Sequence, residues 1–274
     1  MPELPEVETI RRELKAQFIN QTIIRCKVLR KDIVGYPDHK RFCLMLDNTV
    51  VHDVQRKGKY LIINLDGGKR LIFHLRLSGS ITLARPKDPP ERFTRIILET
   101  KKLQVFFNEP RALGRVYLLR KDERPDCLKG FFDLGYEPIS PEFDFRYFKN
   151  ILKQRKARIK SILLDQHYCA GVGNIYSDEA LFHARIRPMR RAYTLNTEEI
   201  FRLLLSLKRV LNQGIKNFGT TVSDYQRTNG RKGNFQKFLY VYAREGEPCR
   251  ICGTKIRLKK ISNRSTRYCP KCQK

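Results

Sequence analysis

Apolar side chains near the start of the chain recur every three or four residues. Prolines stand at positions 2 and 5 of this run, where a first helical turn requires no backbone N–H, and glutamates suit the positive end of a helix. The spacing predicts an amphipathic helix over residues 1–18 with one apolar face. The apolar positions of that face are Leu4, Val7, Ile10, Leu14 and Phe18.

From about residue 22 to residue 119 the helical period disappears, and short β-rich runs follow one another. Turn signals such as Asp47-Asn48 separate them, and no long helical pattern intervenes. Closely spaced strands with such turns predict a β-sandwich. The predicted strands cover residues 22–28, 41–46, 49–54, 60–65, 70–75, 80–83, 94–99, 103–107 and 115–119.

The pattern becomes helical again after a charged, proline-containing stretch at residues 121–145, which we interpret as a linker. Helices are predicted over residues 147–164, 175–184 and 197–217, the last with Asn196 or Thr197 as its N-cap. Residues 220–233 are polar and contain glycine, which predicts a mobile loop. A strand-rich half followed by a helix-rich half places the chain in the α+β class.

The charge balance points to a polyanionic partner. The chain has 274 residues, with 56 lysines and arginines against 28 aspartates and glutamates, a formal charge of +28. Each phosphate that lysine or arginine neutralises releases counterions, so nucleic acid is favoured over an anionic membrane or a merely well-solvated surface. The apolar runs are too short to span a membrane, and no signal peptide is recognisable, which predicts a soluble, cytoplasmic protein.

The last 26 residues contain two Cys-x2-Cys pairs separated by sixteen residues. Two residues between thiolates let a tight turn direct both sulfurs at one tetrahedral ion, so this spacing predicts one structural Zn²⁺. Basic residues and no acidic ones lie between the pairs, as expected of a small hairpin that contacts nucleic acid. The predicted ligands are Cys249, Cys252, Cys269 and Cys272.

The first residues also permit a chemical interpretation. Removal of Met1 would leave Pro2 with a secondary amine, and an α-amino group titrates near pH ~8, so a useful fraction is nucleophilic at neutral pH. Attack on an aldehyde-level carbon would give an iminium, and Glu3 beside it could donate a proton. By itself, an ordinary proline-glutamate helix start explains these residues better.

Residues 2–9, Pro-Glu-Leu-Pro-Glu-Val-Glu-Thr, together with the four-cysteine module, resemble the formamidopyrimidine-DNA glycosylase family, which is grouped with endonuclease VIII. Further matching motifs follow in the same order from end to end of the chain. Leu4 favours the oxidised-purine branch, because the endonuclease VIII branch typically has glycine there. The matching motifs begin at Lys57, His74, Gly171, Gly233 and Gly246.

The resemblance implies a domain organisation and an activity. It implies a β-sandwich catalytic domain over residues 1–130, a linker over 131–145, a helix-two-turns-helix DNA-binding domain over 146–240 and a zinc finger over 241–274. The implied protein is a monomer that binds double-stranded DNA containing oxidised bases and no membrane. It excises 8-oxoguanine and formamidopyrimidines and cleaves the abasic site by β,δ-elimination.

Roles for individual residues follow from the same resemblance. Pro2 would displace the damaged base at C1′ and form a Schiff base, with Glu3 as general acid. Lys59 would contact phosphate and assist elimination, and Arg264 would bind the phosphates that flank the lesion and support the second, δ elimination. Glu6 matches a carboxylate that lines the base pocket, although a charge at a helix start explains it equally well. The further expected contacts to the DNA backbone are Arg92, Arg155, Lys160 and Asn174.

An extruded base leaves a gap in the duplex, which the family fills with Met, Arg and Phe side chains. The matching positions here are Leu77, Arg111 and Leu113, so an apolar wedge is retained. The usual Arg-Arg-Phe-Gly run is altered, because Ala112 replaces the second arginine. Two alternatives stay open: a non-catalytic protein that binds damaged DNA, and an endonuclease VIII-like glycosylase for oxidised pyrimidines.

Overall fold

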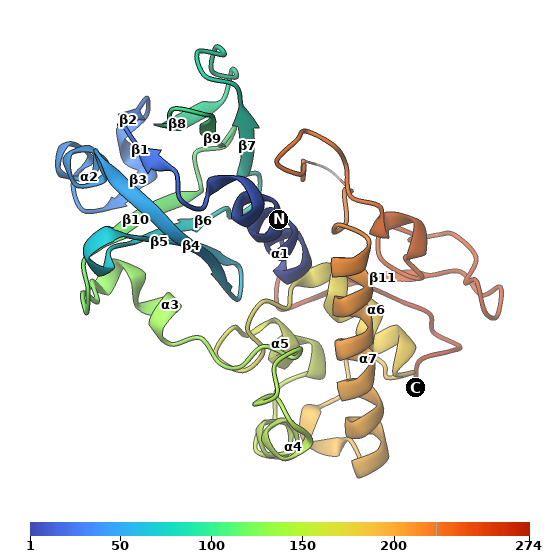
Figure 1. Ribbon diagram of the computed structural model, residues 1–274. Helices are drawn as coiled ribbons and strands as arrows, with labels where there is room; N and C mark the ends of the chain where they lie inside the picture. The colour runs from blue at the N-terminus through green and yellow to red at the C-terminus, as the bar shows by residue number, and fades with distance from the viewer. Residues whose placement is uncertain (223) are drawn as a thin grey trace. The chain divides into compact units, whose positions relative to one another are not determined.

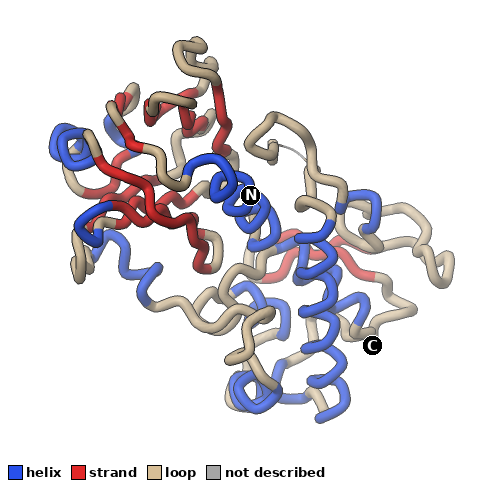
Figure 2. The backbone as a smooth tube through the Cα atoms, viewed as in Figure 1, coloured by secondary structure: helices blue, strands red, loops and turns tan. Residues whose placement is uncertain are grey.

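The computed structural model describes residues 1–222 and 224–274, which form two compact units. Met1–Asp133 and Phe218–Asn234 make the first unit, and Leu134–Asn217 and Phe235–Lys274 make the second. Strands dominate the first unit and helices the second (Figures 1 and 2). The segment at residues 218–234, which the sequence predicted within the helical domain, therefore packs with the strand-rich unit.

The first unit begins with helix α1, whose predicted apolar face is fully buried. The core beneath it combines residues from this helix and from both sheets of the unit. Its helices are α1 (Leu4–Phe18), α2 (His39–Leu46) and α3 (Lys129–Phe132). Its strands are β1 (Thr22–Ile23), β2 (Arg25–Val28), β3 (Val34–Tyr36), β4 (Thr49–Lys57), β5 (Tyr60–Leu65), β6 (Arg70–His74), β7 (Ser80–Ala84), β8 (Thr94–Glu99), β9 (Gln104–Asn108) and β10 (Arg115–Leu119).

These strands form two sheets that enclose the core, which confirms the predicted β-sandwich. The larger sheet has the order β1-β4-β5-β6-β10-β3, and the smaller has the order β2-β8-β9-β7. Neighbouring strands pair antiparallel except β10 and β3, which run parallel. Phe73 of β6 and Phe107 of β9 meet across the core with ring centroids 5.5 Å apart, a favourable edge-to-face contact between the sheets.

Two of the predicted strands were wrong. Residues 41–46 form helix α2, because Asp38 caps its start by accepting hydrogen bonds from the Lys40 and Arg41 N–H groups at 3.0 and 3.1 Å. Phe42 and Leu46, four residues apart, supply its buried face. The run at 22–28 is two strands rather than one, since β1 joins the larger sheet and β2 the smaller.

The second unit consists of helices and a hairpin. Gly214 of α7 lies so close to Tyr176 of α6 that a Cβ there would sit 2.6 Å from the tyrosine ring and hydroxyl, so glycine permits this helix contact. The helices are α4 (Phe145–Lys153), α5 (Ile159–Leu164), α6 (Asn174–His183) and α7 (Thr197–Lys216), and the hairpin strands are β11 (Arg257–Ile261) and β12 (Arg264–Tyr268).

The helix predicted over residues 147–164 is broken into α4 and α5. The chain between them runs alongside residues 190–192, where the Ile159 N–H donates to the Arg190 carbonyl at 2.8 Å. For α7, the structure confirms Asn196 as the N-cap. The Asn196 side chain accepts from the Glu199 N–H, and the Glu199 carboxylate accepts from the Asn196 N–H. Among the described helices, each falls short of the length or apolarity that crossing a bilayer requires.

Candidate functional site

The start of α1 is held by a buried carboxylate. Pro2 and Glu3 are buried, and the Glu3 N–H donates to Glu6 Oε2 at 2.8 Å. Glu6, only 1% exposed, also accepts the Thr220 N–H through Oε1 at 2.7 Å. Gly219 has φ of +79°, and a Cβ there would stand 2.9 Å from Glu6 Oε1. Glu6 therefore joins the first turn of α1 to the segment that begins at residue 218.

Lys59 lies in the turn between β4 and β5, where Lys57 pairs with Tyr60 and Gly58 has φ of +58°. Its side chain is largely buried, with 8% of its surface exposed. The His74 ring of β6 packs at a tilt of 37° against Tyr60, with centroids 4.3 Å apart. Burial, with the charges of Arg76 and Lys59, lowers the pKa of His74 to about 3, so this ring is neutral at physiological pH.

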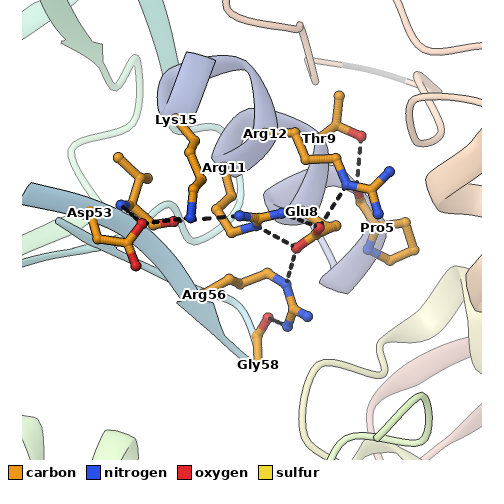
Figure 3. Close-up of polar contacts among 10 residues, drawn as sticks. Pro5, Glu8, Thr9, Arg11, Arg12, Lys15, Asp53, Arg56 and Gly58 are labelled. Carbon is orange, nitrogen blue, oxygen red and sulfur yellow. Dashed lines mark hydrogen bonds and ion pairs between the residues drawn. The ribbon is translucent and has the colours of Figure 1, made fainter. Parts of the chain in front are cut away.

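Arg56 connects α1 to this turn (Figure 3). Its Nε donates to Glu8 Oε2 at 3.1 Å, and its Nη1 donates to the Gly58 carbonyl at 3.1 Å. Arg11 and Arg12 also donate to the Glu8 carboxylate. Burial raises the pKa of Glu8, but these hydrogen bonds and the Arg56 charge outweigh it and lower that pKa to about 2.

The sequence did not reveal this connection between Glu8 and Arg56, because 48 residues separate the partners. Lys15 of α1 adds a second tie to β4, donating to Asp53 at 2.7 Å (Figure 3). The helix that directly follows Pro2 and Glu3 is thereby held against the strand that leads to Lys59. Polar contacts within the first unit thus connect the helix after Pro2 and Glu3 to the turn that contains Lys59.

The three predicted wedge residues lie in two turns of the first unit. Leu77 follows β6 and is 38% exposed, and Leu113 precedes β10 and is 45% exposed. Arg111 is also exposed, and its guanidinium lies 4.0 Å from the Asp224 carboxylate. The Ser78 hydroxyl donates to the Glu109 carboxylate, so the two turns are adjacent.

The predicted mobile loop at residues 220–233 includes Ser223, which lies outside the described residues. Its described part is tied to α1 through Glu13. The Glu13 carboxylate accepts from Arg227 Nε at 2.6 Å and from the Thr228 N–H at 2.9 Å. Tyr225 is buried beside it and donates to the Phe218 carbonyl at 3.1 Å, and burial raises the pKa of this phenol.

In the second unit, Lys160 is fully buried rather than presented to solvent. Its Nζ donates to Asp178 Oδ1 at 2.5 Å and to the Ser265 carbonyl of β12 at 3.2 Å. Asp178 Oδ2 accepts the Arg267 N–H at 3.0 Å. Burial raises the pKa of Asp178 to about 7, although Lys160 acts in the opposite direction. The structure thus places Lys160 inside the second unit, and its phosphate contact stays a prediction.

Arg264 is exposed at the start of β12, directly after a turn formed by Ser262 and Asn263 with φ of 46° and 58°. Ser161 of α5 holds this turn through a hydroxyl–hydroxyl contact of 2.8 Å to Ser262. Together with Lys160, α5 therefore supports the hairpin on both sides of Arg264.

The remaining predicted DNA contacts lie at the surface or near a helix start. Arg92 is exposed over the Phe93 ring at 5.2 Å, and Arg155 is exposed over the Tyr168 ring at 4.9 Å. Asn174 begins α6. Its Oδ1 is buried and has no hydrogen-bond partner among the described residues.

The four predicted zinc ligands converge, with all four sulfur atoms within 4.8 Å of one another. The Sγ atoms of Cys252 and Cys269 are 3.5 Å apart, and those of Cys249 and Cys272 are 3.9 Å apart. Tetrahedral thiolates on Zn–S bonds of about 2.3 Å stand about 3.8 Å apart, so the donor set fits one Zn²⁺. Four protein ligands leave no position for water, and the metal's role is structural.

Loss of the Asp178 carboxylate is expected to destabilise the second unit. The substitution Asp178→Ala leaves the Lys160 ammonium buried without its counter-charge, which costs about 3–5 kcal/mol. Glu247→Ala, which removes an exposed ion pair with Arg244, should cost much less. Thermal unfolding of both variants measures the difference, and equal melting temperatures would contradict the importance of the buried pair.

Comparison with known proteins gives consistent matches along the chain. Models described as the formamidopyrimidine-DNA glycosylase N-terminal domain and H2TH domain match residues 1–116 and 134–226. A model described as a zinc finger found in FPG and IleRS matches residues 246–274. The formamidopyrimidine-DNA glycosylase of Pelotomaculum thermopropionicum is 46% identical over 275 residues, covering 100% of this chain and 99% of the relative.

Solved structures agree with these matches. The Fpg protein of Thermus thermophilus is 36% identical, with a TM-score of 0.91 over 99% of this chain and 98% of that one. A Lactococcus lactis Fpg mutant in complex with DNA containing Fapy-dG is 34% identical, with a TM-score of 0.92 over the whole of both chains. Wild-type Lactococcus lactis Fpg in complex with DNA containing an oxidised pyrimidine gives the same identity, 34%, and a TM-score of 0.91.

Proposed function

Because this chain belongs to the formamidopyrimidine-DNA glycosylase family, we propose that it excises oxidised purines from duplex DNA by attack of the Pro2 amine. It is a base-excision repair DNA glycosylase and abasic-site lyase. The observation that carries the proposal is the support shared by Pro2, Glu3 and Lys59. Glu6 holds the first turn of α1, and Arg56 ties that helix to the Gly58 carbonyl next to Lys59.

The chemistry begins once Met1 is removed, which frees the Pro2 nitrogen. Its lone pair forms a bond to the sugar C1′ while the bond from C1′ to the damaged base breaks. Glu3 donates the proton that the leaving base or the opening sugar ring oxygen needs, since a positioned acid lowers the barrier to that step. The added nitrogen then loses its proton, and its lone pair expels the ring oxygen from C1′ as the 4′ hydroxyl, which leaves an iminium between Pro2 and the sugar.

The iminium makes the C2′ proton acidic, because it accepts the electron pair left when that proton departs. The C3′–O bond then breaks and releases the phosphate on the 3′ side. In a second elimination the C4′ proton departs, and its electron pair forms a double bond as the C5′–O bond breaks. Lys59 assists these steps as a proton donor and phosphate contact, and Arg264 binds the phosphates beside the lesion. Hydrolysis of the final iminium regenerates the Pro2 amine. Zn²⁺ supplies no reactive group and holds the hairpin that carries Arg264.

The substrate is duplex DNA that contains 8-oxoguanine or a formamidopyrimidine. A Lactococcus lactis relative bound to Fapy-dG DNA supports this class. Leu77, Arg111 and Leu113 fill the gap left by the extruded base, which their exposure permits. Arg92, Arg155 and Asn174 contact the backbone, and Asn174 does so at a helix start where N–H groups attract phosphate. Lys160 matches a family position that holds the DNA backbone and also donates to the zinc hairpin, and Glu6 lines the base pocket.

Each predicted domain has its own function in this proposal. Residues 1–130 supply the catalytic groups, 131–145 the linker, 146–240 DNA binding and 241–274 the zinc finger. Residues 218–234, which pack in the first unit, cover the extruded base. The protein acts as a monomer on chromosomal DNA in the bacterial cytoplasm, without a membrane partner, and its bacterial relatives support that location.

Oxidised pyrimidines are the second candidate substrate class. The Lactococcus lactis relative in complex with DNA that contains an oxidised pyrimidine supports this class. A non-catalytic role in damaged-DNA binding is a further alternative, and product analysis distinguishes all three.

The proposal is tested on matched duplexes that contain 8-oxoguanine, a formamidopyrimidine or thymine glycol. We expect faster cleavage of the purine lesions, a one-nucleotide gap with phosphates at both ends, and a borohydride-trapped covalent complex. Faster cleavage of thymine glycol would assign the enzyme to pyrimidine lesions. Gel shift without cleavage on every duplex would leave only the binding role.

A further inference from the structure

Glu109 is a fully buried carboxylate at the end of β9. It accepts hydrogen bonds from the Ser78 hydroxyl, from the Arg111 N–H at 3.1 Å and from the Gly114 N–H at 2.9 Å. Among the described residues no lysine or arginine side chain pairs with this carboxylate. A buried carboxylate is costly unless donors satisfy its oxygens, and these three contacts do so.

The contacts at Arg111 and Gly114 wrap the chain between β9 and β10 around the carboxylate. A Cβ at Gly114 would stand 2.8 Å from Glu109 Oε2, so glycine allows this close approach. Ala112 is held at φ of +54°, and Arg115 Nη1 donates to its carbonyl at 2.9 Å. The result is a closed turn whose backbone has few alternatives.

The third contact reaches a different turn. Ser78, 4% exposed, lies between Leu77 and Gly79, and the Gly79 N–H donates to the Leu75 carbonyl at 2.9 Å. A Cβ at Gly79 would stand 2.5 Å from that carbonyl, so this turn is also tightly closed. The Ser78 hydroxyl is thus the point at which Glu109 connects the turn after β6 to the turn before β10 (strands labelled in Figure 1).

We propose that Glu109 is a positioning residue that locks the turns bearing Leu77, Arg111 and Leu113 into one preorganised wedge for the damaged duplex. This inference rests on the proposed function, which gives those three side chains the gap left by the extruded base. Glu109 itself is fully buried, so it acts on the duplex through the turns that it holds. Because Glu109 keeps the two turns ordered before DNA binds, no conformational entropy is lost in ordering them when the wedge enters the duplex.

The test uses Ser78→Ala and Glu109→Gln. Ser78→Ala breaks only the connection between turns and leaves the backbone contacts of Glu109 in place. Because hydrogen bonds to a charged group are among the stronger ones, we expect single-turnover excision of 8-oxoguanine from a duplex to fall about tenfold or more. A 2-aminopurine placed opposite the lesion should also show a smaller fluorescence rise, since fewer wedges enter the stack.

Single-stranded abasic DNA separates positioning from general damage to the fold. Single-stranded DNA has no duplex gap for the wedge to fill. Both variants should therefore cleave it as fast as the unsubstituted enzyme does. Thr49→Val, which removes another buried hydroxyl in the first unit that bonds a carbonyl at 2.6 Å, should leave both substrates unaffected. In a Leu113→Ala background, Ser78→Ala should cause little further loss, because the wedge is already shortened.

Equal losses on duplex and single-stranded substrates would overturn the inference, as would unchanged duplex excision in both variants. Failure of the proposed function gives a different result. In that case the unsubstituted enzyme forms no borohydride-trapped complex with either DNA.

Discussion

A form of the enzyme that retains Met1 should neither form a borohydride-trapped complex nor release 8-oxoguanine. An uncleaved N-terminal extension keeps the Pro2 nitrogen in a peptide bond, where its lone pair is delocalised and cannot attack C1′. We expect base release to slow by roughly 10³-fold or more, as when a covalent nucleophile is removed. Single-turnover excision and trapping measure the loss, and intact mass establishes the terminus of each preparation.

Pro5→Ala is the control, because Pro5 lies in the first turn of α1, three residues after Pro2, and is also buried but has no free amine. It should retain trapping. Glu3→Gln should slow base release by roughly 10²–10⁴-fold while still forming a trapped complex on a ready-made abasic site, where no base has to leave. Trapping by the extended chain, or a crosslinked peptide outside the N-terminus, would contradict the role of Pro2.

Removal of Zn²⁺ should abolish binding to lesion duplex. Structural zinc contributes about 10–16 kcal/mol of binding free energy in zinc-finger peptides, which is also their folding free energy. The hairpin here has few other stabilising contacts, because β11 is exposed along four of its five residues. A two-stranded hairpin is only marginally stable on its own. Fluorescence anisotropy on lesion duplex before chelation, after chelation and after zinc is restored measures the effect.

Cys269→Ser should reproduce the loss without a chelator, because it removes one of the four ligands. Cys127→Ser is its control, since Cys127 is an exposed thiol of the first unit outside the metal site. Binding that survives complete demetallation would show that Arg264 and its hairpin do not hold the DNA.

Local signals determined much of this protein. The apolar period of α1, the Asn196 and Glu199 cap of α7 and the two Cys-x2-Cys turns each depend on residues within a few positions of one another. Elements and the zinc ligands were therefore predictable, as was the family through its ordered motifs. The prediction for residues 41–46 was wrong. Their apolar content fits a short strand as well as a helix, and the N-cap at Asp38 favours the helix.

Only the tertiary structure decided which charged groups are internal and which segments meet. Ser78 and Glu109 are 31 residues apart in the chain, Glu8 and Arg56 are 48 apart, and Lys160 and Ser265 are 105 apart. No local pattern encodes such pairs, because a lysine or glutamate has the same sequence signal in solvent as in the core. Burial then decides its contacts: Lys160 donates to Asp178 and to the backbone of the hairpin, and Glu109 connects two turns.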